Sequence, residues 1–523
     1  MTRADIKAIA QKDDYLREKL FCRGFLVTDD LSINTDAYPF YSEWRHHRLL
    51  GYSIIAHPLS QVYLLEKKEF AVGLIGHAYN PIAGETHEVS ILNELASSFK
   101  NRTSFFNIVN QLTGVFALFI ATNKELTVLC DAVGLQPIFY CQYSGKCYFS
   151  SHTNLLGDLL NLPEDPEVTR LKKCKTFYYF GNQLPGNITQ FKDVERINPN
   201  HFALYTNKIV QTRFYYPHYR NMGVDDICEN LIDLLQRSMQ MIPQKWNRPA
   251  ISLTGGCDSR TTLACACNIY DRYSYFSYDS QLTERPDAIA GSKISRAIGL
   301  PFTLYEVPYN DDSFPNIESC RAALLWNGGN IRANNPNDVR KRLFLDGLND
   351  FDIEVKSWGS EIGRARYTKR YNGKKSFGKR PSPRKCTTFY KFLLFDRKAV
   401  RISDSAFRSY LNKYFDRDDE RPIPWQDQFY WEWHWPSRDG LNLASEQRYA
   451  YDITVPYNNR IILELLLSVP EEMRINDRIY SMIREKLDNR IDAVTNTVVD
   501  VNHTKMRAIL EATYYYINIL LPF

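Results

Sequence analysis

The fold is decided by a stretch near the middle of the chain that reads Ile251-Ser252-Leu253-Thr254-Gly255-Gly256-Cys257-Asp258-Ser259-Arg260. Apolar and small polar residues alternate up to the Gly-Gly pair, and a helical pattern begins at Thr261. This order predicts a strand, a tight turn and the N-terminus of a helix. Glycine lacks a Cβ and a helix N-terminus offers unpaired N–H groups, so such a turn can bind an anion. We expect the pyrophosphate part of ATP to bind here.

The side chains around this turn fit the same interpretation. Thr254 and Ser259 can donate hydroxyl groups to phosphate oxygens, and Asp258 can hold Mg²⁺ against those oxygens. The alternative is an ordinary strand–turn–helix connection without a ligand. Two other phosphate-binding loops are excluded, because the Gly-Lys-Ser/Thr of a Walker A loop and the G-x-G-x-x-G of a dinucleotide site are both absent.

The composition is that of a globular protein with two or three domains. The chain has 523 residues, of which 44% are hydrophobic and 24% charged, and its net charge is +5. So small a charge gives no reason to expect a nucleic-acid partner. We expect no membrane span and no signal peptide, because long apolar runs are absent. Eleven cysteines without paired spacing indicate reduced thiols and a cytoplasmic location.

Two regions with different patterns follow each other along the chain. Residues 1–215 read as many short strands with few helices, for example at 116–121 and 126–130. Further along, the strand before the Gly-Gly turn and strands at 275–278 and 302–307 alternate with helical segments. This order predicts a parallel sheet, in which ligands bind at the carboxyl ends of the strands. After about residue 390 the pattern is mostly helical.

The segment 364–385 differs from the rest in charge. It carries ten Lys and Arg residues and no acid. Its glycines and prolines predict a loop. Two interpretations stay open: a solvated surface loop, or a mobile basic lid over an anionic substrate or product. Binding of nucleic acid has little support from a single loop.

Several stretches, in order along the chain, resemble the asparagine synthetase family and its relatives, the β-lactam synthetases and lasso-peptide cyclases. Thr254–Ser259 resembles the S-G-G-x-D-S loop of ATP pyrophosphatases, and Lys356–Tyr367 resembles the family motif S-G-x-G-A-D-E-x-x-G-G-Y. Asp452–Asn459 resembles E-V-R-V-P-F-L-D. In the N-terminal half, Leu112–Ala117 and Asp131–Tyr140 resemble G-x-F-A and R-D-x-x-G-x-x-P-L-Y-Y.

The resemblance implies an α/β protein of two domains. Residues 1–215 would form an Ntn-hydrolase-like αββα glutaminase-type domain, and residues 216–523 an ATP-pyrophosphatase (PP-loop) synthetase domain with a parallel sheet and a helical extension. Family glutaminases use a cysteine directly after the initiator Met, where this chain has Thr2. An N-terminal threonine can act as a nucleophile, but the glutamine-pocket motifs of the family are not recognisable around Gly76–Asn80. We therefore expect an inactive, glutaminase-like scaffold.

The resemblance also implies a reaction, with ATP and Mg²⁺ as cofactors. A substrate carboxylate attacks the α-phosphate of ATP to give an acyl-adenylate and pyrophosphate, and an amine then displaces AMP to form an amide. For Glu361, assigned to the metal, the alternative is a surface acid beside Arg364. The residues assigned to the nucleotide are Leu253, Thr254, Gly255, Gly256, Asp258, Ser259, Ser277, Tyr278 and Gly359, and those assigned to Mg²⁺ are Asp258 and Glu361.

The second half of this reaction needs a base for the attacking amine. In the lactam-forming relatives a Tyr–Glu pair serves, and the matching positions are Tyr367 and Asp452. A carboxylate hydrogen-bonded to a phenol can relay a proton. Lys505 is a third catalytic candidate, by its position near the C-terminus. The alternatives are a buried tyrosine, a structural aspartate and a surface lysine.

The substrates stay open at this point. A small acid or a peptide is the expected substrate, and a precursor peptide or a partner protease would be the partner of a lasso-peptide or lactam cyclase. Two other functions remain: an asparagine synthetase that uses ammonia, and a non-catalytic protein that binds nucleotide. No membrane partner is expected.

Overall fold

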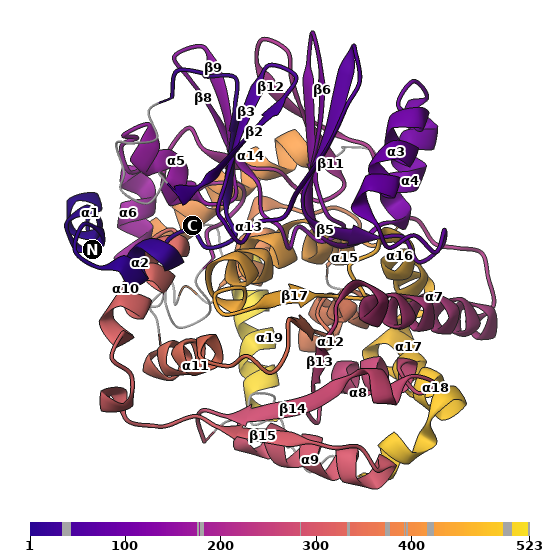
Figure 1. Cartoon of the computed structure of the whole chain (residues 1–523). Helices are drawn as coiled ribbons and strands as arrows, with labels where there is room; N and C mark the ends of the chain where they lie inside the picture. The colour runs from indigo at the N-terminus through magenta and orange to yellow at the C-terminus, as the bar shows by residue number, and fades with distance from the viewer. Residues whose placement is uncertain are drawn as a thin grey trace.

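Three sheets organise the chain (Figure 1). The computed structural model describes residues 1–33, 43–174, 177, 183–282, 284–331, 335–371, 377–391, 393, 396–415, 423–494 and 505–520. In these ranges, two antiparallel six-stranded sheets lie in the N-terminal part and one parallel five-stranded sheet lies in the C-terminal part. The predicted α/β class is therefore confirmed.

The two antiparallel sheets pack face to face. Phe25 and Ile54 of one sheet meet Phe119 and Val128 of the other, and the rings of Phe25 and Phe119 lie 5.7 Å apart. The first sheet has the order β10-β8-β9-β1-β3-β2, with β1 Phe25–Thr28, β2 Arg45–Leu49, β3 Tyr52–Ala56, β8 Phe139–Tyr143, β9 Lys146–Ser150 and β10 Glu195–Arg196. The second has the order β12-β11-β7-β6-β5-β4, with β4 Val62–Glu66, β5 Phe70–Tyr79, β6 Thr113–Thr122, β7 Leu126–Cys130, β11 His201–Tyr205 and β12 Ile209–Arg213.

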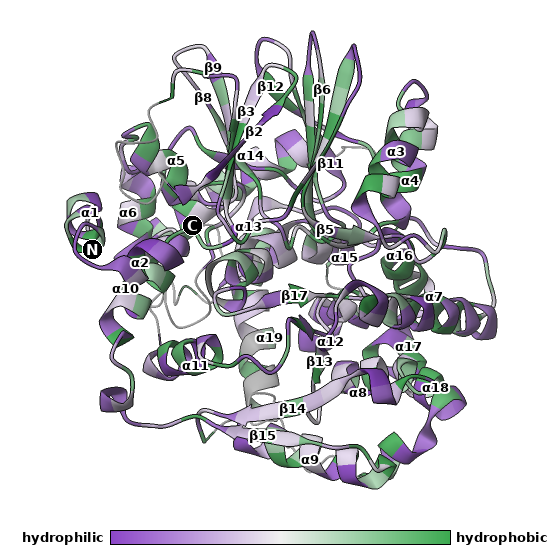
Figure 2. Ribbon diagram, in the orientation of Figure 1, coloured by the Kyte–Doolittle hydropathy of each residue, from purple (hydrophilic) through white to green (hydrophobic). Residues whose placement is uncertain are grey.

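Helices cover the outer faces of both sheets. On the second sheet, Leu92 and Val109 pack against Leu118; on the first, Leu16 packs in one cluster with Leu26. The covering helices are α3 (Glu88–Ser98) and α4 (Arg102–Gln111) on one side, and α1 (Arg3–Ala10), α2 (Asp14–Lys19) and α5 (Thr153–Leu159) on the other. The hydrophobic residues of the strands are green in Figure 2. This gives the expected four layers, helix–sheet–sheet–helix.

The parallel sheet has the order β15-β14-β13-β16-β17, so β13 is its middle strand. From β13 the chain first adds β14 and β15 on one side, and later adds β16 and β17 on the other. A crevice for ligands forms at the carboxyl end of a strand where the order reverses in this way. The strands are β13 (Pro249–Ser252), β14 (Ser274–Asp279), β15 (Thr303–Glu306), β16 (Ile353–Val355) and β17 (Asp452–Thr454). The predicted β-α-β-α-β order is confirmed.

Most of the other described helices lie around this sheet, and α6 (Pro166–Lys172) lies beside the N-terminal sandwich, next to α5 (Figure 1). The rest are α7 (Val224–Lys245), α8 (Cys257–Cys265), α9 (Arg285–Ile298), α10 (Ile317–Asn327), α11 (Pro336–Asp346), α12 (Arg366–Tyr371), α13 (Pro383–Tyr390), α14 (Arg397–Tyr414), α15 (Trp425–Phe429), α16 (Arg460–Ser468), α17 (Glu471–Ile475), α18 (Arg478–Leu487) and α19 (Lys505–Leu520). None of the described helices has the length and apolar character that a bilayer crossing requires.

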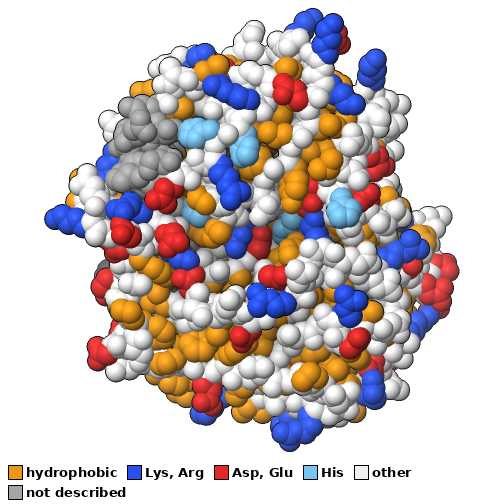
Figure 3. Space-filling view, viewed as in Figure 1, with side chains coloured by type: hydrophobic (Ala, Val, Ile, Leu, Met, Phe, Trp, Pro, Cys, Tyr) orange, Lys and Arg blue, Asp and Glu red, His pale blue; other side chains and the backbone are white. Residues whose placement is uncertain are grey.

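The prediction of one loop over residues 364–385 is wrong at both ends of that segment. Helix α12 lies at its start, and α13 begins at Pro383. Ser382 accepts a hydrogen bond from the amide of Lys385, and Pro383 occupies the first helical position, where a proline is favourable. Residues 372–376 lie outside the described residues. On the face shown in Figure 3, basic side chains are scattered among acidic ones.

Buried polar contacts join the antiparallel sandwich to the C-terminal part. Arg213 of β12 forms a two-pronged ion pair with Glu432, at 2.6 and 2.7 Å, and both side chains are buried. Asn459 donates a hydrogen bond to the carbonyl of Gln111 (2.8 Å), and Arg460 donates to Asn200 (3.0 Å). The predicted domain boundary after residue 215 stays a prediction.

Replacing Arg213 by Met is expected to lower the free energy of unfolding by about 3–5 kcal/mol, because it leaves the buried carboxylate of Glu432 without its counter-charge. Urea denaturation measures the change. Arg237→Met is the control, since its ion pair with Asp233 lies on the surface within α7 and contributes about 0.5 kcal/mol. Equal effects of the two substitutions would contradict the prediction.

Candidate functional site

The predicted anion-binding turn connects β13 to α8, and two hydroxyl groups give it its shape. Ser259 donates to the carbonyl of Thr254 (2.9 Å), and the two hydroxyl oxygens lie 3.0 Å apart. The amide of Gly256, the N-cap of α8, donates to the hydroxyl of Thr254 (3.2 Å). Hydrogen bonds of its own side chains therefore stabilise the turn. The first N–H groups of α8 have no carbonyl partner within the helix, as at the start of any α-helix.

A carboxylate already sits on this turn. Asp287, in the first turn of α9, accepts a hydrogen bond from the amide of Gly255 (3.2 Å). Helix α9 reaches so close because Gly291 faces the turn: a Cβ there would lie 2.7 Å from the carbonyl oxygen of Leu253. The turn thus donates an amide hydrogen bond to a carboxylate of the same chain, and its binding of a nucleotide stays a prediction.

A second turn follows β16 and faces the first one: the short 3-10 helix Ser360–Arg364 with Gly359 as its N-cap. Its Ser360 donates to one carboxylate oxygen of Asp258 (2.7 Å), and Arg364 donates to the other (2.8 Å). Arg364 also forms a two-pronged ion pair with Asp477, at 2.7 and 2.8 Å. Tyr480 of α18 donates to the carbonyl of Ser360 (2.6 Å). These contacts fix the position of Asp258 relative to the turn.

Glu361 is the second acid of the predicted metal site. One of its carboxylate oxygens is buried without a hydrogen-bond partner. Burial and the nearby charge of Asp258 raise the pKa of Glu361. Two carboxylates that repel each other, one of them with an unsatisfied oxygen, fit a divalent cation. Among the described residues no group of three His, Cys, Asp or Glu could hold a metal ion, so phosphate oxygens and water would complete the coordination, as is usual for Mg²⁺.

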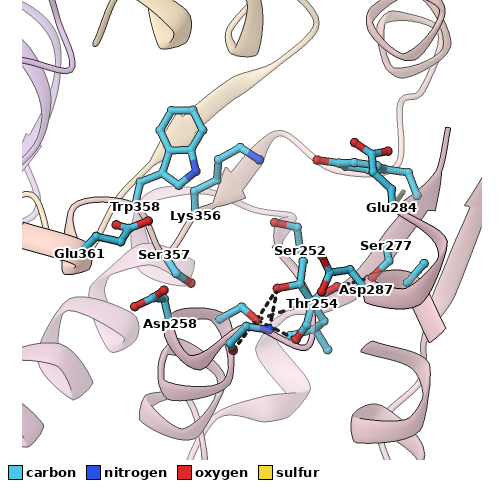
Figure 4. A pocket seen from close by; sticks show the side chains of 15 residues that line it. Ser252, Thr254, Asp258, Ser277, Glu284, Asp287, Lys356, Ser357, Trp358 and Glu361 are labelled. Atoms are coloured by element: carbon cyan, nitrogen blue, oxygen red, sulfur yellow. Dashed lines mark hydrogen bonds between the residues drawn. The ribbon is translucent and has the colours of Figure 1, made fainter. Parts of the chain in front are cut away.

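The two turns and the start of α9 enclose a pocket of about 290 Å³ at the carboxyl ends of β13, β14 and β16 (Figure 4). Eight predicted residues line it: Leu253, Thr254, Gly256, Asp258, Ser259, Ser277, Tyr278 and Glu361. Seven others were not predicted: Ser252, Glu284, Asp287, Ala288, Lys356, Ser357 and Trp358. Gly255 and Gly359 belong to the two turns without lining the pocket, and Gly359 adopts a left-handed conformation with φ of 87°.

The structure does not bring Tyr367 and Asp452 together, and neither lines the pocket. Tyr367 is buried in α12, its ring 4.0 Å from that of Phe389 and its hydroxyl 3.4 Å from Nδ1 of His434. Asp452 begins β17 and pairs in register with Ile353, the first residue of β16. It therefore lies at the amino ends of the parallel strands, away from the pocket. The side chain of Lys505 lies outside the described part of the structure.

Asp452 instead belongs to a buried polar cluster beside the N-terminal sandwich. It accepts a hydrogen bond from Arg448 (2.8 Å), and Arg23 and His77 lie 3.6 and 3.8 Å away. Burial alone would raise the pKa of Asp452, but the guanidinium groups of Arg448 and Arg23 hold it well below its ordinary value. Burial lowers the pKa of His77 to about 3. The structural interpretation of Asp452 accounts for these contacts.

Thr2 is a helix cap. Its hydroxyl accepts a hydrogen bond from the amide of Asp5 (3.2 Å), and its own amide donates to the carboxylate of Asp5 (2.7 Å). The N-terminus lies beside α1, outside the two sheets (Figure 1), and β1 begins only at Phe25. This geometry gives no support to Thr2 as a nucleophile, and the scaffold role of the N-terminal half stays a prediction.

Comparisons with known proteins find an amidotransferase-type domain in this half. Residues 103–216 match the family model of a glutamine amidotransferase domain. No curated protein sequence matches the chain. Solved structures with some similarity include glutamine phosphoribosylpyrophosphate amidotransferase from B. subtilis, complexed with ADP and GMP (11% identity, 68% of this chain and 73% of that one, TM-score 0.24). Another is described as the allosteric regulatory enzyme of purine biosynthesis (9% identity, 60% and 78%, TM-score 0.24).

Asp452→Asn is expected to lower the free energy of unfolding by about 3 kcal/mol at neutral pH, because Arg448 and Arg23 lose their counter-charge. The pKa of Asp452 is depressed in the folded state, so the carboxylate stabilises the fold above pH about 4 and this contribution falls as the pH is lowered. Denaturation near neutral pH and in acid should therefore show a smaller difference between variant and wild type in acid. A difference independent of pH would argue against this role.

Proposed function

We propose that the protein is an ATP-dependent ligase that forms amide bonds and releases AMP and pyrophosphate. The observation that carries the proposal is the pocket at the carboxyl end of β13, where a turn that binds a carboxylate through its amide faces the acid pair Asp258 and Glu361. The amidotransferase-type domain in residues 103–216 supports chemistry on amide nitrogen. A small acid or a peptide is the proposed substrate.

The nucleotide is proposed to lie across the two turns. The amide of Gly255 would hold the pyrophosphate in place of the carboxylate of Asp287. The amide of Gly256 and the hydroxyl of Ser259 would exchange their hydrogen bonds to Thr254 for bonds to the pyrophosphate. Leu253, Ser277 and Tyr278 line the pocket on the side of β14, where the nucleoside would lie.

Asp258 and Glu361 would hold Mg²⁺, and the ion would neutralise charge on the departing pyrophosphate. Arg364 keeps Asp258 oriented toward the pocket, because Asp477 fixes its guanidinium group from the other side. Carboxylates that are already ordered bind a cation without a further loss of side-chain freedom.

The proposed chemistry has two steps. A carboxylate oxygen of the substrate forms a bond to the α-phosphorus of ATP as the bond to pyrophosphate breaks. An amine then forms a C–N bond to the acyl carbon, AMP leaves, and the amine gives up a proton. Since Thr2 is occupied as a helix cap, the amine or ammonia would come from solution or from the substrate itself, as in an intramolecular cyclisation.

A screen of ATP–pyrophosphate exchange across amino acids, small acids and peptides tests the proposal. Exchange that depends on one acid supports it and identifies the acyl donor. Formation of asparagine from aspartate and ammonia would instead identify an asparagine synthetase. Tight binding of ATP without pyrophosphate production for any acid would favour a non-catalytic nucleotide-binding protein.

Asp258→Asn is expected to slow ATP–pyrophosphate exchange about 100-fold or more, because the charge that holds the cation is lost. Asp477→Asn is the matched control: it also removes a partner of Arg364 but lies outside the pocket. Asp477→Asn should reduce the exchange activity much less, because Ser360 still holds Asp258 and both carboxylates of the proposed metal site remain. Equal losses in the two variants would show that Arg364, rather than the metal site, is responsible.

A further inference from the structure

Acidic side chains outnumber basic ones among the residues that line the pocket. Four acids line it: Asp258, Glu284, Asp287 and Glu361. Lys356 is the single Lys or Arg among its lining residues. Arg364 and Lys341 pair with Asp258 and Glu284 but do not line the pocket. The ammonium group of Lys356 is therefore the cation that the lining residues offer to a phosphate oxygen.

Lys356 is held in place by the sheet and by its neighbour Glu354. Its amide, directly after β16, donates to the carbonyl of Thr454 (3.0 Å). Its ammonium group donates to Glu354 (2.6 Å), whose side chain is fully buried. Although burial favours a neutral amine, this carboxylate keeps the pKa of Lys356 above its ordinary value. The ammonium group is therefore charged, and it has three N–H donors.

The position of the Lys356 side chain in the pocket indicates which part of a bound nucleotide it would contact. Figure 4 shows its side chain across the pocket from Thr254, between Glu361 on one side and Glu284 on the other. The turn at Thr254 is the proposed pyrophosphate site, and Tyr278 lines the proposed nucleoside side. The α-phosphate lies between the pyrophosphate and the nucleoside in ATP, so in the proposed binding mode it would come close to the side chain of Lys356.

We propose that Lys356 is a catalytic residue that donates hydrogen bonds from its ammonium group to the α-phosphate, and that Glu354 is its positioning residue. The inference rests on the proposed function. As the substrate carboxylate bonds to phosphorus, negative charge grows on the α-phosphate oxygens, and a fixed ammonium group stabilises that charge without giving up its proton. Glu354 prevents the side chain from turning away, because leaving its own buried carboxylate unpaired is costly.

The competing explanation is that Lys356 only neutralises Glu354. Replacing Lys356 and Glu354 together distinguishes this explanation from binding of the α-phosphate. If Lys356 serves Glu354 alone, then replacing both residues by Gln removes the unpaired charge and restores nucleotide binding. If Lys356 binds the α-phosphate, the double variant stays defective, although it recovers the stability that Lys356→Gln loses.

The test measures binding of AMP, adenosine and Mg·ATP to the full chain by calorimetry. AMP differs from adenosine by the α-phosphate alone. We expect Lys356→Gln to weaken AMP binding about tenfold or more, as for the loss of one charge-assisted hydrogen bond, and to leave adenosine binding unchanged. Lys356→Arg should retain part of the AMP affinity. Asp258→Asn should weaken Mg·ATP binding and leave AMP binding intact.

Lys19→Gln is the matched control, because Lys19 is also buried and paired with an acid, Asp346 (2.5 Å), but lies outside the pocket. Unchanged AMP binding in Lys356→Gln, or recovery of AMP binding in the double variant, would overturn the inference while leaving the proposed function standing. Failure of the wild-type protein to bind Mg·ATP would overturn both. Thermal denaturation of each variant checks that it is folded.

Discussion

The reversal of strand order at β13 is the constraint on which the site depends. Because β14 and β16 lie on opposite sides of β13, the segments that follow these three strands meet at one edge of the sheet. They bring the turn at 253–256, the start of α9 and the turn at 360–364 around one space. A parallel sheet with all its crossovers on one side of β13 would place those segments in a row and leave no enclosed pocket.

The motifs in the N-terminal half and in Asp452–Asn459 acquire a structural explanation. Asp131 is buried and accepts hydrogen bonds from the backbone amides of Leu135 and Gln136 (2.9 and 2.7 Å). Within the same loop, the amide of Val133 donates a hydrogen bond to the side chain of Asn458 in the C-terminal part (3.0 Å). Asp131 thus shapes its own loop, and the hydrogen bond between Val133 and Asn458 joins the two halves of the protein. The same reasoning covers Asp452.

Local patterns predicted the local parts of this structure. The strand, turn and helix around Gly255 could be identified because periodicity and glycine content act over a few residues. Strands β16 and β17 have three residues each, too few for periodicity, and without β16 the position of Lys356 at the pocket edge could not be predicted. Asp287 was missed for a related reason: it reaches Gly255 across 32 residues of chain. The glycines and prolines of residues 364–385 predicted a loop, and this composition gave no sign of the helix that begins at Pro383.

The hydrogen bond from Gly255 to Asp287 has a consequence for selectivity. A ligand that binds at the turn has to displace the carboxylate of Asp287. Because this carboxylate belongs to the same chain, it loses little conformational freedom when it binds to the turn again. Chloride or a single carboxylate from solution offers no more charge than a carboxylate side chain and also loses its freedom of movement on binding, so it would displace Asp287 poorly. If the proposed function is correct, Asp287 would therefore disfavour the common small anions of the cell relative to a polyphosphate.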